Sequence, residues 1–257
     1  TRTDSSAASD VYKRQELEYA HLPLVLGEDK KRLSKRHAAT SLNAYKEMGF
    51  TRETIINALA LLGWSTENEI FSMNELIKSF NLKNVQKGAA VFDLKRFNWV
   101  SSQHLAKLND DAFIEAIHPF MKDEGIDDVA PNYKEILIAM RTSKTNLKEI
   151  AYATRPFFFE LEEYDEKGVN KFLKGSLETL TFALETLSKI SEWNETELDM
   201  ALINVRDYFN LPIPKVNQPM RIALVGSTIS PSLGLTLELF GKEKSLERIK
   251  KAIDFIS

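Results

Sequence analysis

A dense basic segment is the part of the sequence whose residue types best suit chemistry. Five of the seven residues from Lys30 to Arg36 are basic, and Gly27 precedes them. Cations at this density repel one another unless an anion lies between them. A loop of this composition could clamp a polyphosphate, because phosphoryl transfer needs positive charge beside the developing negative charge. The alternative, which composition alone favours, is a solvated basic face.

Composition narrows the classes of protein that the sequence can encode. Its 257 residues include no cysteine, which excludes disulfides, cysteine-ligated zinc, iron–sulfur clusters and thiol nucleophiles. The formal net charge is −3, so binding to nucleic acid would depend on a local positive face. The longest apolar stretch, residues 55–64, covers about half of a bilayer. We therefore expect a globular cytoplasmic protein without membrane contact.

Helical spacing of apolar residues dominates the sequence, and alternating strand patterns are rare. Thr51 is placed to cap a helix that runs through Leu62 and ends at Gly63. Because this helix is apolar on most sides, we expect most of its sides to be buried. Ser72 and Glu75 have the spacing of a capping box before a short helix. These patterns predict a mostly α fold.

Two later helices have similar signals, and two joints separate the helical stretches. Asn194 and Glu197 form a second capping-box pattern, and Asn210 ends the helix that follows. A last helix is predicted to start near Ser245. Its apolar stripe contains Leu246, Ile249, Ile253 and Ile256. Polar or charged residues indicate joints at 83–91 and, more weakly, at 160–174.

Four ordered segments are similar to those of a known family. They are Arg32-Leu33-Ser34-Lys35-Arg36 and residues 59–64, 92–99 and 219–248. The first resembles the KMSKS signature of class I aminoacyl-tRNA synthetases, in the form typical of bacterial glutamyl-tRNA synthetases. The others resemble a helix beyond that signature, the start of the helical anticodon-binding region, and the family's C-terminus. The resemblance runs from about residue 16 to the end of the sequence.

This resemblance implies a domain organisation. Residues 1–15 are polar, small and aperiodic, and we interpret them as an unrelated or artefactual leader. Residues 16–90 would hold the KMSKS-like loop and stem-contact helices, and residues 91–257 the α-helical anticodon-binding region, with a possible subdivision near 160–175. No HIGH-like motif occurs, so the Rossmann catalytic domain is expected to be missing. The expected fold is mostly α: a helical stem-contact region followed by a two-part α-helical anticodon-binding domain.

The resemblance also implies roles for the basic loop. Lys35 aligns with the signature lysine that neutralises charge on the ATP phosphates while the adenylate forms, and would be the catalytic residue. Arg32, Leu33, Ser34 and Arg36 would complete the phosphate-binding loop. Arg32 replaces the commoner lysine and keeps its charge with a different geometry. The alternative for Lys35 is an ordinary surface lysine.

Two residues near the C-terminus align with positions that touch anticodon bases in family members. Arg221 could pair with base edges or stack on unpaired bases, and Ser230 keeps a hydroxyl where threonine also occurs. The alternative for Arg221 is a buried structural arginine. The alternative for Ser230 is a helix cap before Pro231.

A third anticodon position departs from the family pattern. Ser143 lies where some members have an arginine that reads the third anticodon base, and Arg141 or Lys144 would have to substitute for it. The departure leaves open whether glutamate and glutamine anticodons are discriminated.

Aromatic and C-terminal basic residues have two interpretations each. Residues 157–159 and Phe172 could stack on bases, although core packing is favoured, and Trp64 and Trp99 are expected to anchor packing. The C-terminal cations could contact phosphates or form the solvated side of an amphipathic helix. They are Lys242, Lys244, Arg248, Lys250 and Lys251.

The resemblance implies a glutamate–tRNA ligase as the parent enzyme, which attaches glutamate to tRNA-Glu with ATP and, as expected for ATP, Mg²⁺. This chain would supply the ATP-phosphate loop and the tRNA contacts, with ATP and glutamate otherwise bound by the missing domain. We expect it to be monomeric, to lack a metal site of its own and to be inactive alone. One alternative is a stand-alone, non-catalytic tRNA-binding module. Another is a helical protein whose basic loop binds some other polyanion.

Overall fold

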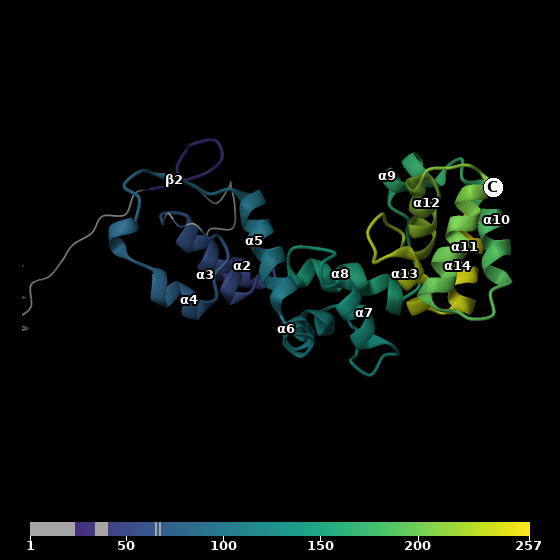
Figure 1. Cartoon of the computed structure of the whole chain (residues 1–257), viewed down its shortest axis with the longest axis horizontal. Helices are drawn as coiled ribbons and strands as arrows, with labels where there is room; N and C mark the ends of the chain where they lie inside the picture. Colours follow the sequence, from purple (N-terminus) through teal and green to yellow (C-terminus); the bar gives the residue numbers. More distant parts are fainter. Residues whose placement is uncertain (1–23, 34–40, 65, 67) are drawn as a thin grey trace, which may run out of the picture.

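The computed structural model describes residues 24–33, 41–64, 66 and 68–257, which form an extended row of helices (Figure 1). Helices make up 64% of the structure, so the mostly α prediction is confirmed. The elements are β1 (Val25–Leu26), α2 (Leu42–Glu47), α3 (Arg52–Leu61), α4 (Met73–Ser79), a 3₁₀ turn (Leu82–Asn84), β2 (Ala90–Val91), α5 (Leu94–Lys107), α6 (Asp110–Asp123), α7 (Tyr133–Met140), α8 (Leu147–Phe158), α9 (Glu166–Gly168), a π turn (Val169–Leu173), α10 (Leu177–Ser188), α11 (Glu195–Tyr208), α12 (Ile213–Val225), α13 (Leu233–Phe240) and α14 (Lys242–Ile256).

The predicted helix starts are confirmed where side chains cap the first turn. Thr51 Oγ1 accepts the N–H of Thr54 at the start of α3. Ser72 begins α4 with both bonds of a capping box, since its hydroxyl accepts the N–H of Glu75 and the Glu75 carboxylate accepts the N–H of Ser72. Asn194 caps α11 through the N–H of Glu197. These local bonds satisfy N–H groups that a helix leaves free at its start.

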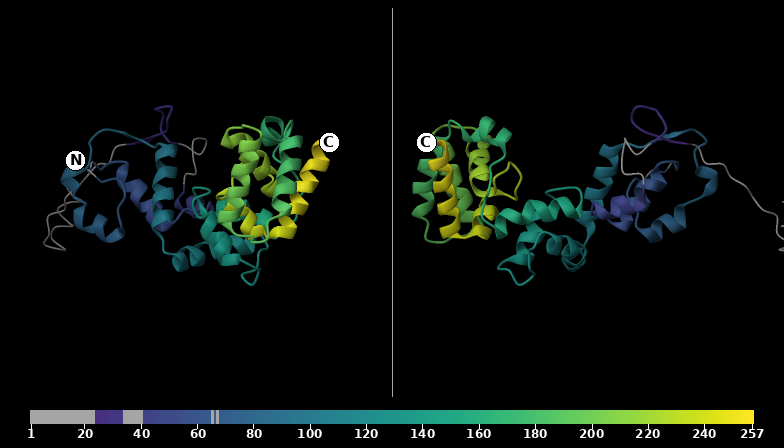
Figure 2. Two further views of the ribbon diagram at one scale, coloured as in Figure 1. Left: turned by 45° about the vertical axis from the view of Figure 1, so that its right-hand side comes forward. Right: turned by 180° about the vertical axis from the view of Figure 1, so that it is seen from behind.

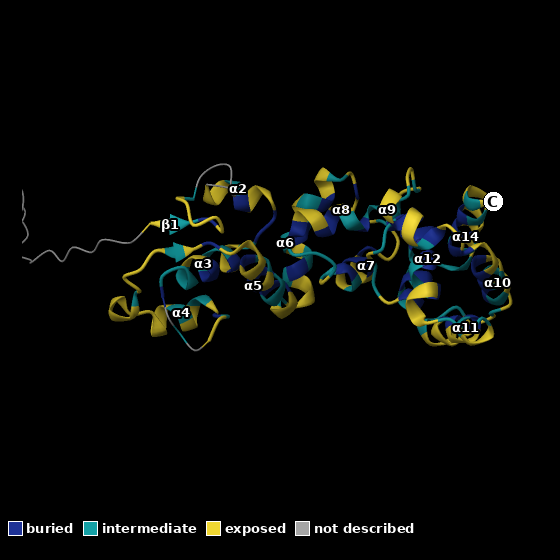
Figure 3. Cartoon of the chain, turned by 90° about the horizontal axis from the view of Figure 1, so that it is seen from above, coloured by how far each residue is buried: buried dark blue, intermediate teal, exposed yellow. Residues whose placement is uncertain are grey.

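One expectation about a helix was wrong, and another helix begins a few residues before its expected start near Ser245. The most buried positions of α3 are Thr54, Asn57 and Ala58, whereas Leu59 is 47% exposed. Figure 3, coloured by burial, shows that α3 combines buried and less buried residues. The reason is that α3 turns Asn57 inward, where its side chain bonds other parts of the chain, and leaves an apolar side outward. The last helix begins at Lys242, before the predicted Ser245, because α13 and α14 are separated by Gly241 alone.

A small parallel sheet joins two segments far apart in the sequence. Val25 pairs with Ala90 and Leu26 pairs with Val91, with helices α2 to α4 in between. The sequence pattern did not predict this pairing, because strands of two residues are too short to show alternation.

Two hydrophobic clusters organise the described residues. The N-terminal cluster comprises Tyr45, Phe50, Ala58, Phe92 and Phe97. The second is larger and runs from Leu105 through α6 to α8 and on to Ala252 in α14. Its last part is the bundle of α10 to α14, which the two further views place at one end of the molecule (Figure 2). The predicted domain boundaries, and the subdivision near 160–175, stay predictions.

Candidate nucleic-acid interface

A tight hairpin carries the first part of the basic segment. After β1 the chain turns back, with hydrogen bonds from Gly27 N to the carbonyl of Lys31 and from Leu33 N to the carbonyl of Val25 (2.8 and 2.9 Å). Arg32 is exposed, and Leu33 packs against the N-terminal cluster. The hairpin thus fixes one side of the segment to the protein and leaves the Arg32 guanidinium in solvent. Of the other predicted ATP-binding residues, Ser34, Lys35 and Arg36 lie outside the described residues.

At the other end of the molecule, Arg221 and Ser230 are in direct contact. Arg221 Nε donates to Ser230 Oγ, and its Nη2 donates to the carbonyl of Pro231, both at 2.9 Å. Thr236 Oγ1 lies 3.0 Å from Ser230 Oγ. Arg221 is partly buried, and burial lowers the pKa of its guanidinium from the ordinary value, although arginine stays protonated in proteins. Arg221 therefore holds the loop between α12 and α13.

The structure supports the structural alternative for Arg221 and contradicts the helix-capping alternative for Ser230. The bonds of Arg221 agree with a structural arginine, although its side chain is only partly buried. A capping role for Ser230 was wrong, because α13 begins after Ser232 and the Ser230 hydroxyl contacts Arg221 and Thr236 instead. Contact with anticodon bases stays a prediction for both residues.

The three residues at the predicted third anticodon position have different environments. Arg141 is bound internally: Nη1 donates to the carbonyl of Leu108 at 2.9 Å, Nη2 pairs with the Asp110 carboxylate, and the guanidinium lies 5.0 Å from the centre of the Phe113 ring. Its side chain is 14% exposed. Arg141 is thus poorly placed to substitute for a base-reading arginine.

Lys144 remains the better placed cation at this position. Ser143 Oγ is buried and has no hydrogen-bond partner among the described residues. Lys144 is partly exposed and lines a cleft of about 620 Å³. Ser227 and Ile229, from the loop that Arg221 holds, line the same cleft. The fold therefore brings Lys144 and the loop that contains Ser230 to one cleft, although they are more than 80 residues apart in the sequence.

The cleft also contains Tyr152 and Arg155, which sequence reasoning missed, and Phe159, for which it favoured core packing over base stacking. Tyr152 and Phe159 of its wall are 67% and 38% exposed. The Arg155 guanidinium lies between them, 5.9 Å from the Tyr152 ring centre and 5.2 Å from that of Phe159. The acidic segment 160–166 also lines the cleft. Helical spacing of two aromatics around an arginine was the signal that could have identified this face.

Other aromatic predictions are partly confirmed. Phe157 is buried and stacks on Phe240 with ring centres 4.6 Å apart, as core packing predicts. Trp64 is also buried, at 5% exposure. Trp99 is 43% exposed, so its expected role as a packing anchor was wrong: it lies on the outward side of α5, whose inward residues are Phe97 and Val100.

Three C-terminal cations perform a task that neither interpretation included. Arg248 is 2% exposed and donates to the carbonyls of Leu224 and Phe159 at 2.5 and 2.7 Å. Lys244 Nζ donates to the carbonyl of Phe157, and Lys242 Nζ to that of Ile190. These carbonyls lie at or just beyond the C-termini of α12, α8 and α10, where helices leave acceptors free and favour cations. Helix α14 thus caps three other helices.

Two family models match the chain in sequence order. The anticodon binding domain model matches residues 112–253, and the catalytic domain model of class I tRNA synthetases (E and Q) matches residues 8–99. The first match alone covers more than half of the chain. The chain belongs to the glutamyl-tRNA synthetase family.

Individual relatives agree with this assignment. Glutamate–tRNA ligase of Legionella pneumophila is 36% identical over 241 residues, which are 93% of this chain and 51% of the relative. That of Syntrophotalea carbinolica is 37% identical over 243 residues, 92% of this chain and 51% of the relative. The crystal structure of a glutamate tRNA ligase from Elizabethkingia meningosepticum in complex with its amino acid superposes with a TM-score of 0.75 at 27% identity, covering 98% of this chain and 54% of that one. The chain spans about half the length of the curated relatives it matches.

The described residues hold neither a metal-binding group nor a membrane-spanning helix. They contain no group of three or more histidine, aspartate or glutamate side chains that could hold a metal ion. Within the same residues, no helix is long and apolar enough to cross a membrane.

Proposed function

We propose that this chain is the tRNA-contacting half of a cytoplasmic, monomeric glutamate–tRNA ligase, which attaches glutamate to tRNA-Glu at the expense of ATP. The observation that carries the proposal is the order of the two family matches, with a class I catalytic segment before an anticodon binding domain. The glutamate–tRNA ligases that align along more than nine-tenths of the chain support it.

The basic segment would supply charge to the ATP phosphates. Arg32 is exposed at the end of the β1 hairpin, where its guanidinium is free to meet an anion. Lys35 would neutralise charge that develops on the α-phosphate and the leaving pyrophosphate, as its place in the KMSKS-like signature implies. We assign none of the described residues to the Mg²⁺ that accompanies ATP.

The cleft between α8 and the loop after α12 would receive unpaired bases of the anticodon. Tyr152 and Phe159 offer exposed ring faces, and base–aromatic stacking stabilises single-stranded RNA binding by about 1–3 kcal/mol per base. Carboxylates of segment 160–166, which also lines the cleft, can accept hydrogen bonds from amino groups of bases. Lys144 would attract a phosphate at the edge of the cleft, and Arg221 and Ser230 would present the loop.

A competition experiment tests the tRNA proposal. The chain is titrated with labelled tRNA-Glu in a filter-binding assay, with double-stranded DNA as competitor. We expect tRNA to stay bound under an excess of DNA, because the cleft suits unpaired bases. Equal affinity for tRNA and duplex DNA at moderate salt would instead indicate a general polyanion-binding protein.

A pair of lysine variants places the contact on the molecule. Lys144→Ala removes a cation of the cleft, and we expect weaker tRNA binding and a salt slope reduced by about one unit. Lys189→Ala, at an exposed position after α10, is the matched control and should change neither quantity. Identical behaviour of the two variants would exclude Lys144 from the interface.

A further inference from the structure

Helix α5 belongs to both halves of the molecule. Phe97 near its start is part of the N-terminal cluster, and Leu105 near its end is part of the large C-terminal cluster. In Figure 1 this helix leads from the region of α2 to α4 toward α6 and α8. One helix alone would leave the angle between the two halves sensitive to bending. Further contacts beside it therefore decide how firmly the halves are held.

The turn between α2 and α3 provides such a contact. Gly49 has a φ of +84°, and its carbonyl accepts the N–H of Leu147 at 2.9 Å. Leu147 is the first residue of α8, whose free N–H groups need acceptors. Asn146 satisfies a second one, the N–H of Glu149, at 2.8 Å. A turn of the N-terminal half thus caps a helix of the C-terminal half, nearly one hundred residues away.

The approach at this contact is too close for any side chain at position 49. A Cβ on Gly49 would lie 2.5 Å from the backbone nitrogen of Lys148 and 3.0 Å from that of Leu147. Backbone atoms at the start of a capped helix cannot move away as a flexible side chain could. The positive φ adds a conformational cost for any residue other than glycine.

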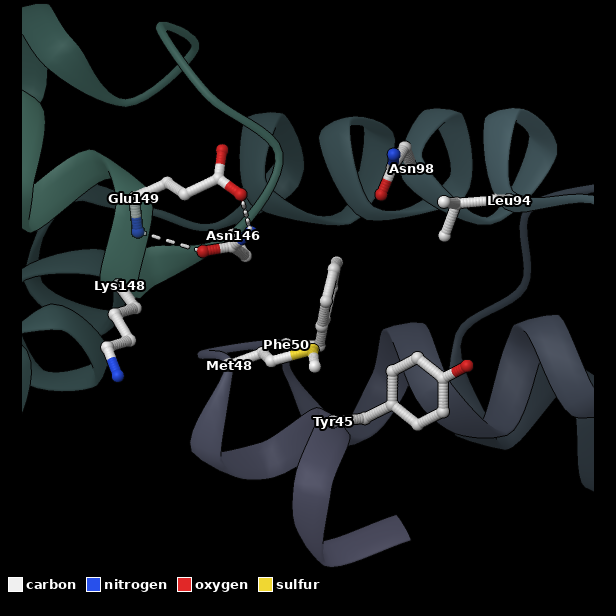
Figure 4. A pocket seen from close by; sticks show the side chains of 8 residues that line it. All are labelled: Tyr45, Met48, Phe50, Leu94, Asn98, Asn146, Lys148 and Glu149. Atoms are coloured by element: carbon white, nitrogen blue, oxygen red, sulfur yellow. Dashed lines mark hydrogen bonds between the residues drawn. The ribbon is translucent and has the colours of Figure 1, made fainter. Parts of the chain in front are cut away.

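A second bond supports the same junction, and a cavity lies beside it. Ser101, fully buried in α5, donates its hydroxyl to the carbonyl of Thr145 at 2.5 Å, just before α8. The cavity of about 320 Å³ lies between α2, α5 and the start of α8 (Figure 4). Phe50 and Tyr45 face it from one side and Asn98 from α5. Because side chains leave this space open, the close approach at Gly49 and the two hydrogen bonds hold the halves together beside it.

We infer that Gly49 is a positioning residue: its contact with the start of α8, supported by Ser101, sets the angle between the half that carries the basic hairpin and the half that carries the Arg221 cleft. The role in tRNA binding rests on the proposed function. A single folded RNA must reach both halves at once, and binding at two linked sites is strengthened only where the geometry permits both contacts.

The angle can be measured directly, because the sequence contains no cysteine that would compete for labels. Cysteines at Ile77 in α4 and Tyr208 in α11, which are 71% and 69% exposed, accept a fluorophore pair at opposite ends of the molecule (Figure 1). Energy transfer in single molecules then reports the distance distribution. We expect one narrow peak for the parent chain and a shifted or broadened one for Gly49→Ala.

Gly125→Ala is the matched control. Gly125 also has a positive φ, +74°, but a Cβ there meets no atom within 4 Å. In both variants alanine must adopt an unfavourable positive φ, but only Gly49→Ala should displace α8. If the two give the same distance distribution, the inference is refuted. If Gly49→Ala does not fold, Ser101→Ala provides the test, and a distribution as narrow as that of the parent refutes the role of the junction.

Affinity for tRNA-Glu completes the test. We expect Gly49→Ala to bind at least about tenfold more weakly while Gly125→Ala binds as the parent does. A changed distance with unchanged affinity would overturn the positioning role. If the parent chain shows a narrow distribution but binds no tRNA, the proposed function fails, and with it the tRNA-placing role, while the junction itself stands.

Discussion

Replacement of Arg248 by methionine tests whether α14 stabilises the bundle by capping other helices. Methionine keeps the apolar stem of the side chain and ends before the position of the two terminal nitrogens, so it removes the hydrogen-bond donors of the guanidinium. The carbonyls of Leu224 and Phe159 then lose their donors, and the contact of the guanidinium with the Phe240 ring, at 4.5 Å, is lost too. The variant therefore removes the two capping bonds together with this ring contact.

The structure sets the size of the effect. Each hydrogen bond from a charged donor contributes about 1.5–3 kcal/mol, which gives about 3–6 kcal/mol for the two carbonyls. The burial of a charge offsets part of this, and Arg248 Nε is buried without a hydrogen-bond partner among the described residues. A net loss of about 3 kcal/mol remains. For a chain of this size that corresponds to a fall in melting temperature of about 6–12 °C.

Urea and thermal unfolding, followed by circular dichroism, measure this loss. The matched control is Lys250→Met, at an exposed position of the same helix, for which we expect a change within about 0.5 kcal/mol. Arg248→Lys keeps the charge but has one nitrogen for two separated carbonyls, so its stability should lie between the other two. Equal stability of Arg248→Met and Lys250→Met would refute the capping argument. A changed salt dependence of tRNA binding with unchanged stability would support a phosphate contact instead.

Three further predictions follow from other parts of the chain. Burial, and then the nearby Lys107, lower the pKa of His104 from its ordinary 6.5, so the folded state favours the neutral imidazole. The stability that depends on neutral His104 should be complete above pH 6.5 and should fall as the pH drops toward the lower pKa of the folded state. Urea unfolding from pH 8 to 5 should therefore show a smaller loss of stability for His104→Gln than for the parent chain. Ser72→Ala should destabilise the chain by about 1 kcal/mol through loss of the capping box, measured by thermal unfolding against Ser79→Ala, which lies at the end of the same helix. In the complete enzyme, Lys35→Ala should reduce pyrophosphate exchange by orders of magnitude, and unchanged exchange would contradict its assignment.

Local chemistry was predictable from the sequence, whereas contacts between distant segments were not. Caps at Thr51, Ser72 and Asn194 depend on residues three positions apart, so their spacing is visible in the sequence. The contact of Gly49 with Leu147 depends on how two regions pack, which no local pattern records. The sequence therefore identified the helices and the family, but not the junction between the halves.

Helix α14 illustrates a prediction that was confirmed but incomplete. The predicted stripe is confirmed, because Ile249 is fully buried and Leu246, Ile253 and Ile256 pack against the core. The pattern did not reveal that Ser245, Arg248 and Ala252 are buried as well. These share one helical face by their spacing. A charged residue occupies that face because the neighbouring helix ends present carbonyls, which hydrophobic patterning cannot reveal. In the candidate site, likewise, the family resemblance identified Arg221 and Ser230, but only the fold shows that they contact each other.

The capping by α14 also has a consequence for synthesis on the ribosome. Lys244 follows the carbonyl that it caps, that of Phe157, by 87 residues. At about 5–20 residues per second, α8 is made about 4–17 s before its cap. During that interval the C-terminal end of α8 has neither its lysine nor its arginine donor, and the bundle lacks one of its walls. A nascent chain stopped before residue 242 should therefore be more readily cleaved by protease around residues 157–160 than one stopped after residue 251.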